Sequence, residues 1–153
     1  MAMSPYVAQL RAAMGPAVLL LPSATVLPVD ALGRLLLVQH RGHSDGWGTV
    51  GGAVEIGESP RQAALRETLE EIGAVPRTLS LLDVLGGPEF EAAYPNGDRA
   101  AYVTSVFRAD LGSQATVPDG EEIVEIEWLS REALMTARLN RFTRAVLLGV
   151  GIL

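Results

Sequence analysis

The segment of residues 51–75, GGAVEIGESPRQAALRETLEEIGAV, constrains the fold more than any other part of this 153-residue sequence. Ser59 is a residue type favoured as a helix N-cap, Pro60 suits the first helical position, and Gln62 completes a capping box. Gly73 is placed to end the helix about four turns later. The segment therefore predicts a short capped helix that follows a glycine-rich loop.

The side chains of this helix divide into two faces. At about 100° per residue, one apolar stripe is expected to be buried, formed by Leu65, Leu69 and Ile72. The opposite face carries three carboxylates close enough to repel one another, those of Glu67, Glu70 and Glu71. The simplest interpretation of such a face is a solvated acidic surface.

Two features favour a bound cation over that interpretation. The glutamates lie in the last turns of the helix, where the helix dipole disfavours negative charge. The glycines that precede the helix, Gly51, Gly52 and Gly57, allow a loop to pass close to a compact ligand. Because Mg²⁺ prefers carboxylate and carbonyl oxygens, the segment predicts a divalent metal site.

The same residues resemble the signature of the Nudix hydrolases of the MutT type, G-x5-E-x7-R-E-U-x-E-E-x-G-U. The pattern runs from Gly52 to Ala74, and its other fixed positions are Glu58, Arg66, Glu67, Glu70, Glu71 and Gly73. Thr68 and Ala74 stand where an aliphatic residue is usual, and both changes concern packing. Val50 replaces a proline that is common just before the signature.

The resemblance implies an α/β (α+β) fold, an α/β/α sandwich with a mixed sheet and a loop–helix–loop motif, as one domain over residues 1–153. It implies a pyrophosphohydrolase that requires Mg²⁺, with Mn²⁺ as a substitute. Such enzymes act on phosphoanhydride bonds and cleave a nucleoside diphosphate linked to another moiety. The substrate itself depends on variable loops and cannot be named from the sequence.

Residue roles also follow from the resemblance. Glu67, Glu70, Glu71 and the carbonyl of Gly51 are expected to hold the metal. Glu58 is expected to pair with Arg66, while Gly52 and Gly73 shape the motif. The general base stays open between a helix glutamate and an acid of a distal loop. In that loop, residues 119–122, we favour Glu122 over Glu121; the alternative is that both are solvated charges.

Three further side chains are candidate substrate contacts. Arg41 could bind a phosphate, and Trp47 and Tyr94 could stack on a base, although solvation and packing are the commoner roles. His40 and His43 lack a third ligand at metal-binding spacing, so we interpret them as surface or substrate-edge residues.

Outside this segment the pattern predicts strands separated by isolated helices. Helices are expected at residues 4–14, 131–137 and 141–148, and strands at residues 17–29 (with a bend or sheet edge at Pro22), 34–40, 90–94, 101–111 and 123–128. The strands at 90–94 and 101–111 are joined by a tight turn at Asn96-Gly97.

Composition excludes several classes of function. The net charge of −6 disfavours a long nucleic acid as partner, and the absence of cysteine excludes thiol catalysis. The most apolar stretch, residues 17–38, is interrupted by two prolines and by charges, so we expect a cytoplasmic protein without a membrane span. The apolar end, residues 146–153, fits either the core or a homodimer interface.

Two other classes of protein compete with an enzyme. A Nudix-type domain that only senses a nucleotide usually sits beside a DNA-binding domain and tends to lose glutamates of the signature. This chain keeps them all. A purely structural protein would not need the acidic helix face, so hydrolysis is the predicted function.

Overall fold

The structure, a computed structural model, describes residues 3–153 and leaves residues 1 and 2 of the predicted domain range outside the description. The helices are α1 (Pro5–Met14), α2 (Pro60–Ile72), α3 (Arg131–Thr136) and α4 (Arg141–Gly149), with a 3-10 turn, η1 (Pro88–Phe90). The strands are β1 (Leu19–Pro28), β2 (Leu35–His40), β3 (Val50–Ala53), β4 (Thr78–Leu85), β5 (Glu91–Ala93), β6 (Arg99–Asp110) and β7 (Ile123–Leu129).

The main sheet is mixed, as the sequence predicted. Its strands follow the order β3-β1-β6-β4, and β5 adds to β6. β1 and β6 run parallel, in register from Leu19 opposite Ala100 to Pro28 opposite Ala109, while the other pairs in this sheet are antiparallel. A separate antiparallel pair joins β2 to β7.

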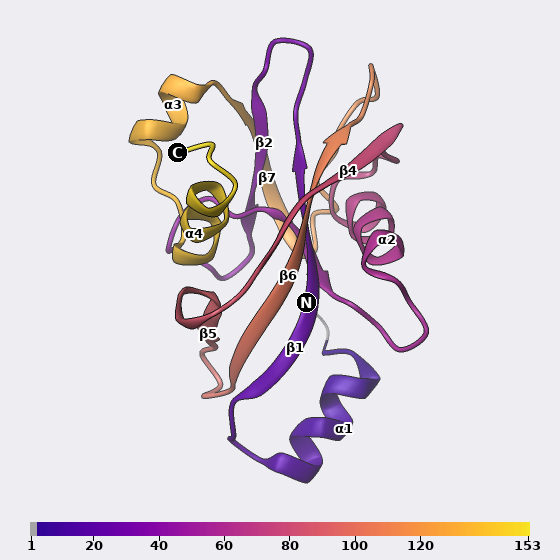
Figure 1. The fold of residues 1–153 in the computed structure, drawn as a ribbon, viewed down its shortest axis with the longest axis vertical. Helices are drawn as coiled ribbons and strands as arrows, with labels where there is room; N and C mark the ends of the chain where they lie inside the picture. The colour runs from indigo at the N-terminus through magenta and orange to yellow at the C-terminus, as the bar shows by residue number, and fades with distance from the viewer. Residues whose placement is uncertain (1–2) are drawn as a thin grey trace.

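Helices cover both sides of the strands (Figure 1). α2 lies on one side, α3 and α4 lie on the other, and α1 sits beyond the lower end of β1. One core lies under α2 and includes Val26, Val50 and Ile72. The second core lies under α4 and includes Val146 and Leu147, both fully buried, so the apolar C-terminal segment contributes to the core. The predicted α/β/α sandwich is confirmed.

The first helix has the predicted caps. The Ser4 hydroxyl accepts a hydrogen bond from the Val7 N–H, and Gly15 ends the helix by donating to the Arg11 carbonyl. Arg11 in turn donates to the carbonyls of Ala17 and Arg99, which ties the helix to the base of β6. None of the residues of α1 is buried. None of the helices within residues 3–153 has the length and apolarity needed to cross a bilayer.

Pro22 lies inside a central strand. β1 is continuous and is flanked by β3 and β6, so this proline is not on a sheet edge. Its carbonyl accepts a hydrogen bond from the Val54 N–H at 3.0 Å, directly after the end of β3. Because β3 ends at Ala53, no residue of β3 lies opposite Pro22. The absence of an N–H group at this proline therefore removes no hydrogen bond between β1 and β3.

The edge strand β4 is absent from the sequence-based prediction. Its register shifts between Leu81 and Asp83, and this bulge interrupts the alternation by which a strand is recognised. Leu81, Leu82 and Val84 are exposed on it.

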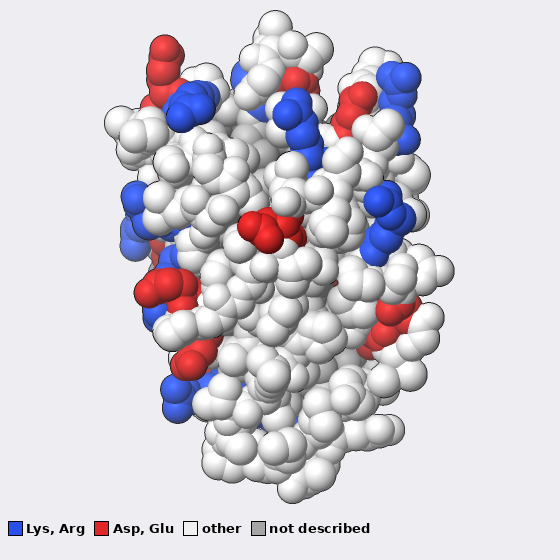
Figure 2. All heavy atoms as spheres, in the orientation of Figure 1, with Lys and Arg blue, Asp and Glu red and all other residues white. Residues whose placement is uncertain are grey.

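On the face shown in Figure 2, charged side chains gather at the upper rim and the flanks, while the lower centre is largely uncharged.

The approach of β3 to β1 depends on a glycine. Gly51 has a φ of +143°, and a Cβ atom there would lie 2.1 Å from the Ala24 carbonyl oxygen. Gly51→Ala should therefore lower the free energy of unfolding by about 3 kcal/mol or more. Urea unfolding of the metal-free protein measures this loss.

Gly57→Ala is the matched control. Gly57 also has a positive φ, +82°, but a Cβ atom there would meet nothing within 4 Å. We expect a loss of only about 1–2 kcal/mol, from backbone strain alone. Equal losses for the two variants would show that the contact with β1 is not what requires a glycine at position 51.

Candidate active site

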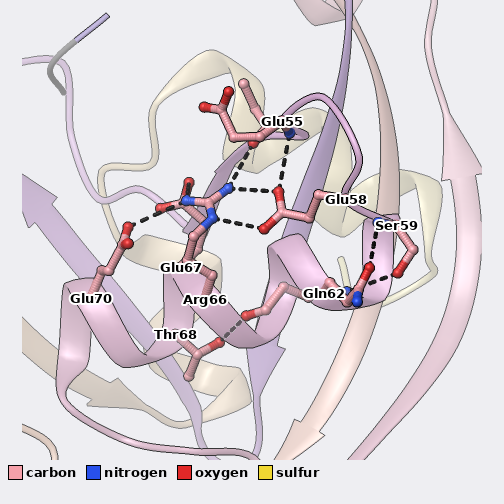
Figure 3. A network of polar contacts seen from close by, with 10 residues as sticks. Glu55, Glu58, Ser59, Gln62, Arg66, Glu67, Thr68 and Glu70 are labelled. Carbon is pink, nitrogen blue, oxygen red and sulfur yellow. Dashed lines mark hydrogen bonds and ion pairs between the residues drawn. The ribbon is translucent and has the colours of Figure 1, made fainter. Parts of the chain in front are cut away.

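The capped helix α2 forms as predicted. The Ser59 hydroxyl accepts from the Gln62 N–H at 3.2 Å, and the Gln62 side chain accepts from the Ser59 N–H at 2.8 Å (Figure 3). Gly73 adopts the left-handed conformation, φ +67°, and its N–H donates to the Leu69 carbonyl. The helix therefore begins and ends where its sequence requires.

The helix is rotated relative to the predicted faces. Its buried residues are Ala63, Ala64, Glu67, Thr68, Glu71 and Ile72. Leu69 is 53% exposed, so its assignment to the buried stripe was wrong. The reason is that α2 packs on β3 and β1, where small alanines and the glycines of β3 permit a close approach and buried carboxylates find donors. Thr68 fits this interior because its hydroxyl donates to the Ala64 carbonyl at 2.7 Å.

An ion pair fixes the loop to the helix. Arg66 Nε and Nη2 donate to the two carboxylate oxygens of Glu58 at 2.8 and 3.0 Å, and Nη2 also donates to the Ala53 carbonyl at 3.0 Å (Figure 3). Glu58 further accepts from the Glu55 N–H. The hydrogen bonds from Arg66 hold the pKa of Glu58 below its usual value. The structure thus contains the pair that the signature implied.

The same arginine contacts two of the predicted metal ligands. Arg66 Nη1 lies 2.7 Å from Glu67 Oε1 and 3.3 Å from Glu70 Oε2. Glu67 is 5% exposed, and burial, opposed by Arg66 and reinforced by the nearby Glu71, raises its pKa to about 7. The side chain of Glu70 is 58% exposed. Glu67 therefore belongs to the interior and Glu70 to the rim.

Glu71 is the most buried carboxylate of the site, at 1% exposure. Its Oε2 accepts from the Gly51 N–H at 3.0 Å, whereas Oε1 has no hydrogen-bond partner among the described residues. Burial raises the pKa of this carboxyl group; the nearby His40 and the Gly51 N–H oppose the shift, and the charge of Glu122 adds to it. An ionised carboxylate with an unsatisfied oxygen is costly to bury, so a cation would stabilise it.

The distal loop is held against the end of α2. Asp119 Oδ1 accepts from the N–H groups of Glu121, Glu122 and Ile123, and the Asp119 N–H donates to the Glu71 carbonyl at 3.2 Å. Glu122 is close enough to Glu71 to raise its pKa, while the side chain of Glu121 is exposed. The loop therefore brings Glu122 to the helix carboxylates.

Arg41 supports this loop. Its guanidinium donates to the carbonyls of Gly120 and Glu121, both at 2.8 Å. The backbone N–H of Arg41 donates to the Glu122 carbonyl at 2.7 Å. The side chain predicted to bind a substrate phosphate is thus engaged in holding the segment that carries Glu122.

The other two predicted substrate contacts have interior partners. Trp47 is partly buried against the core under α4. The hydroxyl of Tyr94 is paired with that of Tyr102, whose ring packs edge-on at 6.1 Å from the ring of Phe142 in α4. The stacking of these two aromatic rings on a base stays a prediction.

The side chains of this site are of the types that bind a divalent cation. Within residues 3–153, no group of three or more His, Asp or Glu side chains stands arranged to hold an ion. Arg66 instead contacts Glu67 where a metal would compete for the carboxylate. A divalent cation beside these side chains would satisfy the buried oxygen of Glu71 and favour the ionised form of Glu67, whose pKa is raised.

Sequence reasoning missed one neighbour of this site. His40, interpreted as a surface or substrate-edge residue, ends β2 with its Nε2 atom 3.6 Å from Glu71 Oε1. The signal that could have found it is its position at the end of an apolar strand directly before Arg41-Gly42, since strand ends collect functional side chains.

Comparison with known proteins decides the family. The model of the NUDIX domain matches residues 19–148. The chain belongs to the Nudix family. Dihydroneopterin triphosphate diphosphatase of Escherichia coli (strain K12) is 45% identical over 60 residues, 38% of this chain and 40% of that protein. The alignment therefore spans well under half of that curated relative.

Solved Nudix structures share the fold. A MutT NUDIX hydrolase from Burkholderia pseudomallei superposes with a TM-score of 0.69 and 24% identity, covering 84% of this chain and 95% of the other. The NUDIX domain of Shewanella oneidensis NrtR, complexed with ADP ribose, gives a TM-score of 0.68 and 21% identity, covering 96% and 95%.

The raised pKa of Glu67 predicts a stability cost at neutral pH. A carboxyl group whose pKa rises from 4.5 to about 7 on folding contributes stability that is complete below the unfolded value and lost as the pH rises through about 7. Metal-free Glu67→Gln stays neutral, so at pH 8 it should be about 1–3 kcal/mol more stable than the parent. Urea unfolding in a chelator at pH 8 and pH 5 measures the difference, which should shrink at the lower pH.

Glu70→Gln is the control on the same helix. It removes an exposed carboxylate that also contacts Arg66, and its effect should stay below about 0.5 kcal/mol at either pH. A metal-free Glu67→Gln less stable than the parent at pH 8 would mean that the contact with Arg66 outweighs burial.

Proposed function

We propose that this Nudix domain is a metal-dependent pyrophosphohydrolase that cleaves a nucleoside diphosphate linked to another moiety. The observation that carries the proposal is the pair of buried carboxylates of Glu67 and Glu71, one of which has an oxygen without a partner among the described residues. Two desolvated acids on one helix destabilise the metal-free fold, which favours a binding role over a structural one.

We assign the cation to Glu67, Glu70, Glu71 and the carbonyl of Gly51, with Mg²⁺ expected from these hard oxygen ligands. When bound, it would supply charge neutralisation of the phosphate oxygens and an oriented water for attack on phosphorus. Arg66 is linked to both Glu58 and Glu67, so it keeps the helix carboxylates in register with the loop.

The proton of the attacking water needs an acceptor, and we assign that role to Glu122. Its loop is held by Asp119 and by Arg41, so the carboxylate approaches Glu71 from a fixed backbone. A base on a rigid support loses little entropy when the substrate binds, which suits proton transfer at the transition state.

The substrate class is best resolved by a screen. The similarity to a dihydroneopterin triphosphate diphosphatase favours a triphosphate, and the fold of a domain complexed with ADP ribose favours an ADP-ribose-like compound. Nucleoside triphosphates, ADP-ribose and nucleotide sugars should be tested with Mg²⁺ for release of phosphate products. Tight binding of one compound without turnover would instead identify a nucleotide-sensing domain.

Replacing Glu71 tests the metal assignment. Glu71→Gln keeps the size of the side chain and removes its charge, so turnover on the best substrate should fall about 100-fold or more while the fold persists. Glu127→Gln, on the exposed face of β7, is the control and should retain the parent rate. Parent-level turnover by Glu71→Gln would overturn the assignment.

The two loop glutamates test the base. Glu122→Gln should lower kcat much more than it raises KM, because its role belongs to the transition state. Glu121→Gln should change kcat and KM little, since the side chain of Glu121 is exposed and Arg41 bonds to its backbone carbonyl, which the substitution keeps. Small and equal effects would place the base on the helix, with Glu67 the next candidate.

A further inference from the structure

Glu71 and His40 face each other across a short gap. Glu71 Oε1 is buried and lacks a hydrogen-bond partner among the described residues, and His40 Nε2 lies 3.6 Å from it. That separation exceeds an ordinary N–H···O hydrogen bond of about 2.7–3.2 Å. The two polar atoms thus lie close together but beyond ordinary hydrogen-bond range.

The position of the histidine ring is built into the fold. His40 ends β2, and Gly48 packs against its ring: a Cβ atom on Gly48 would lie 2.8 Å from Nδ1 and 2.9 Å from Cε1. The backbones of Gly48 and Val38 are joined by two hydrogen bonds, of 2.8 and 2.9 Å. The absence of a side chain at Gly48 therefore leaves the space that the imidazole fills beside Glu71.

We propose that His40 is a metal ligand, which shares one ion with Glu71 and adds to the affinity of this centre for Co²⁺ and Zn²⁺, while Mg²⁺ binds through the carboxylates alone. Imidazole nitrogen suits Zn²⁺ and the later transition-metal ions such as Co²⁺, whereas Mg²⁺ and Mn²⁺ take oxygen ligands. The inference rests on the proposed function only in placing a divalent ion at Glu71.

The gap has the size that a shared ion requires. Metal–nitrogen and metal–oxygen bonds of about 2.0–2.2 Å, meeting near the tetrahedral angle, separate the two ligand atoms by about 3.4 Å. The observed 3.6 Å is close to that span. A shared ion would also satisfy the buried Glu71 oxygen, which the imidazole at 3.6 Å does not.

Metal titration of the metal-free protein tests the proposal without reference to activity. Calorimetric titrations with Co²⁺, Zn²⁺ and Mg²⁺ should give the tighter binding for Co²⁺ and Zn²⁺. In His40→Ala, affinity for Co²⁺ and Zn²⁺ should fall about tenfold or more, while affinity for Mg²⁺ changes by less than about twofold. The visible spectrum of the Co²⁺-loaded protein should change in parallel, because it reports loss of a nitrogen ligand.

Two further variants complete the design. His43→Ala removes the neighbouring exposed histidine, whose ring centroid is 6.0 Å from that of His40, and should leave all three affinities unchanged. His40→Gln refills the space beside Gly48 with an amide, so it should keep Mg²⁺ binding and still lose Co²⁺ binding. It also guards against misfolding of the alanine variant.

The remaining outcomes separate a failure of the His40 proposal from a failure of the proposed function. Equal losses of Co²⁺ and Mg²⁺ affinity, or no loss of either, would overturn His40 as a ligand and leave the metal assignment of Glu71 intact. A parent protein that binds none of the three ions would overturn the proposed function itself.

Discussion

The hydrogen bond from the Gly51 N–H to the Glu71 carboxylate is the contact on which the arrangement of the site depends. It joins the strand β3 to the helix α2 and requires both to approach closely. Gly51 makes that approach achievable on the β1 side, where no Cβ atom could fit, and Ala63 and Ala64 make it achievable on the helix side. A bulkier residue at any of these points would move the carboxylate away from the site.

The guanidinium of Arg66 interacts with the glutamates of the site to different extents. Arg66 donates two hydrogen bonds to Glu58 through Nε and Nη2, and its Nη1 contacts Glu67 and Glu70. The consequence is a graded set of acids: the pKa of Glu58 is lowered, that of Glu67 is raised to about 7, and that of Glu71 is raised by deeper burial. Such grading separates the acid that supports the loop from the acids that are available to a ligand.

Local signals carried much of the prediction, and long-range packing accounts for what they missed. The caps at Ser59 and Gly73 depend on neighbours in sequence, and both are confirmed. The orientation of Leu69 depends on which face meets the glycine strand, which helical periodicity alone does not reveal. His40 and Glu71 lie close together only because β2 and α2 are brought together in the fold. Strand β4 was not predicted because its bulge interrupts the alternation of apolar and polar residues. The roles of the site residues remain predictions.

The parallel pairing of β1 with β6 has a consequence for how the chain reaches this fold. Residue 19 pairs with residue 100, so the centre of the sheet closes only after most of the chain is available. Helix α2 forms from local contacts, yet the strand on which it packs stays without its parallel partner until then. Contacts of such large sequence separation slow folding, because the entropy of closing the intervening chain is lost before the contact forms. During synthesis, the edge of β1 that pairs with β6 therefore stays without its partner strand until residues 100–109 have been made.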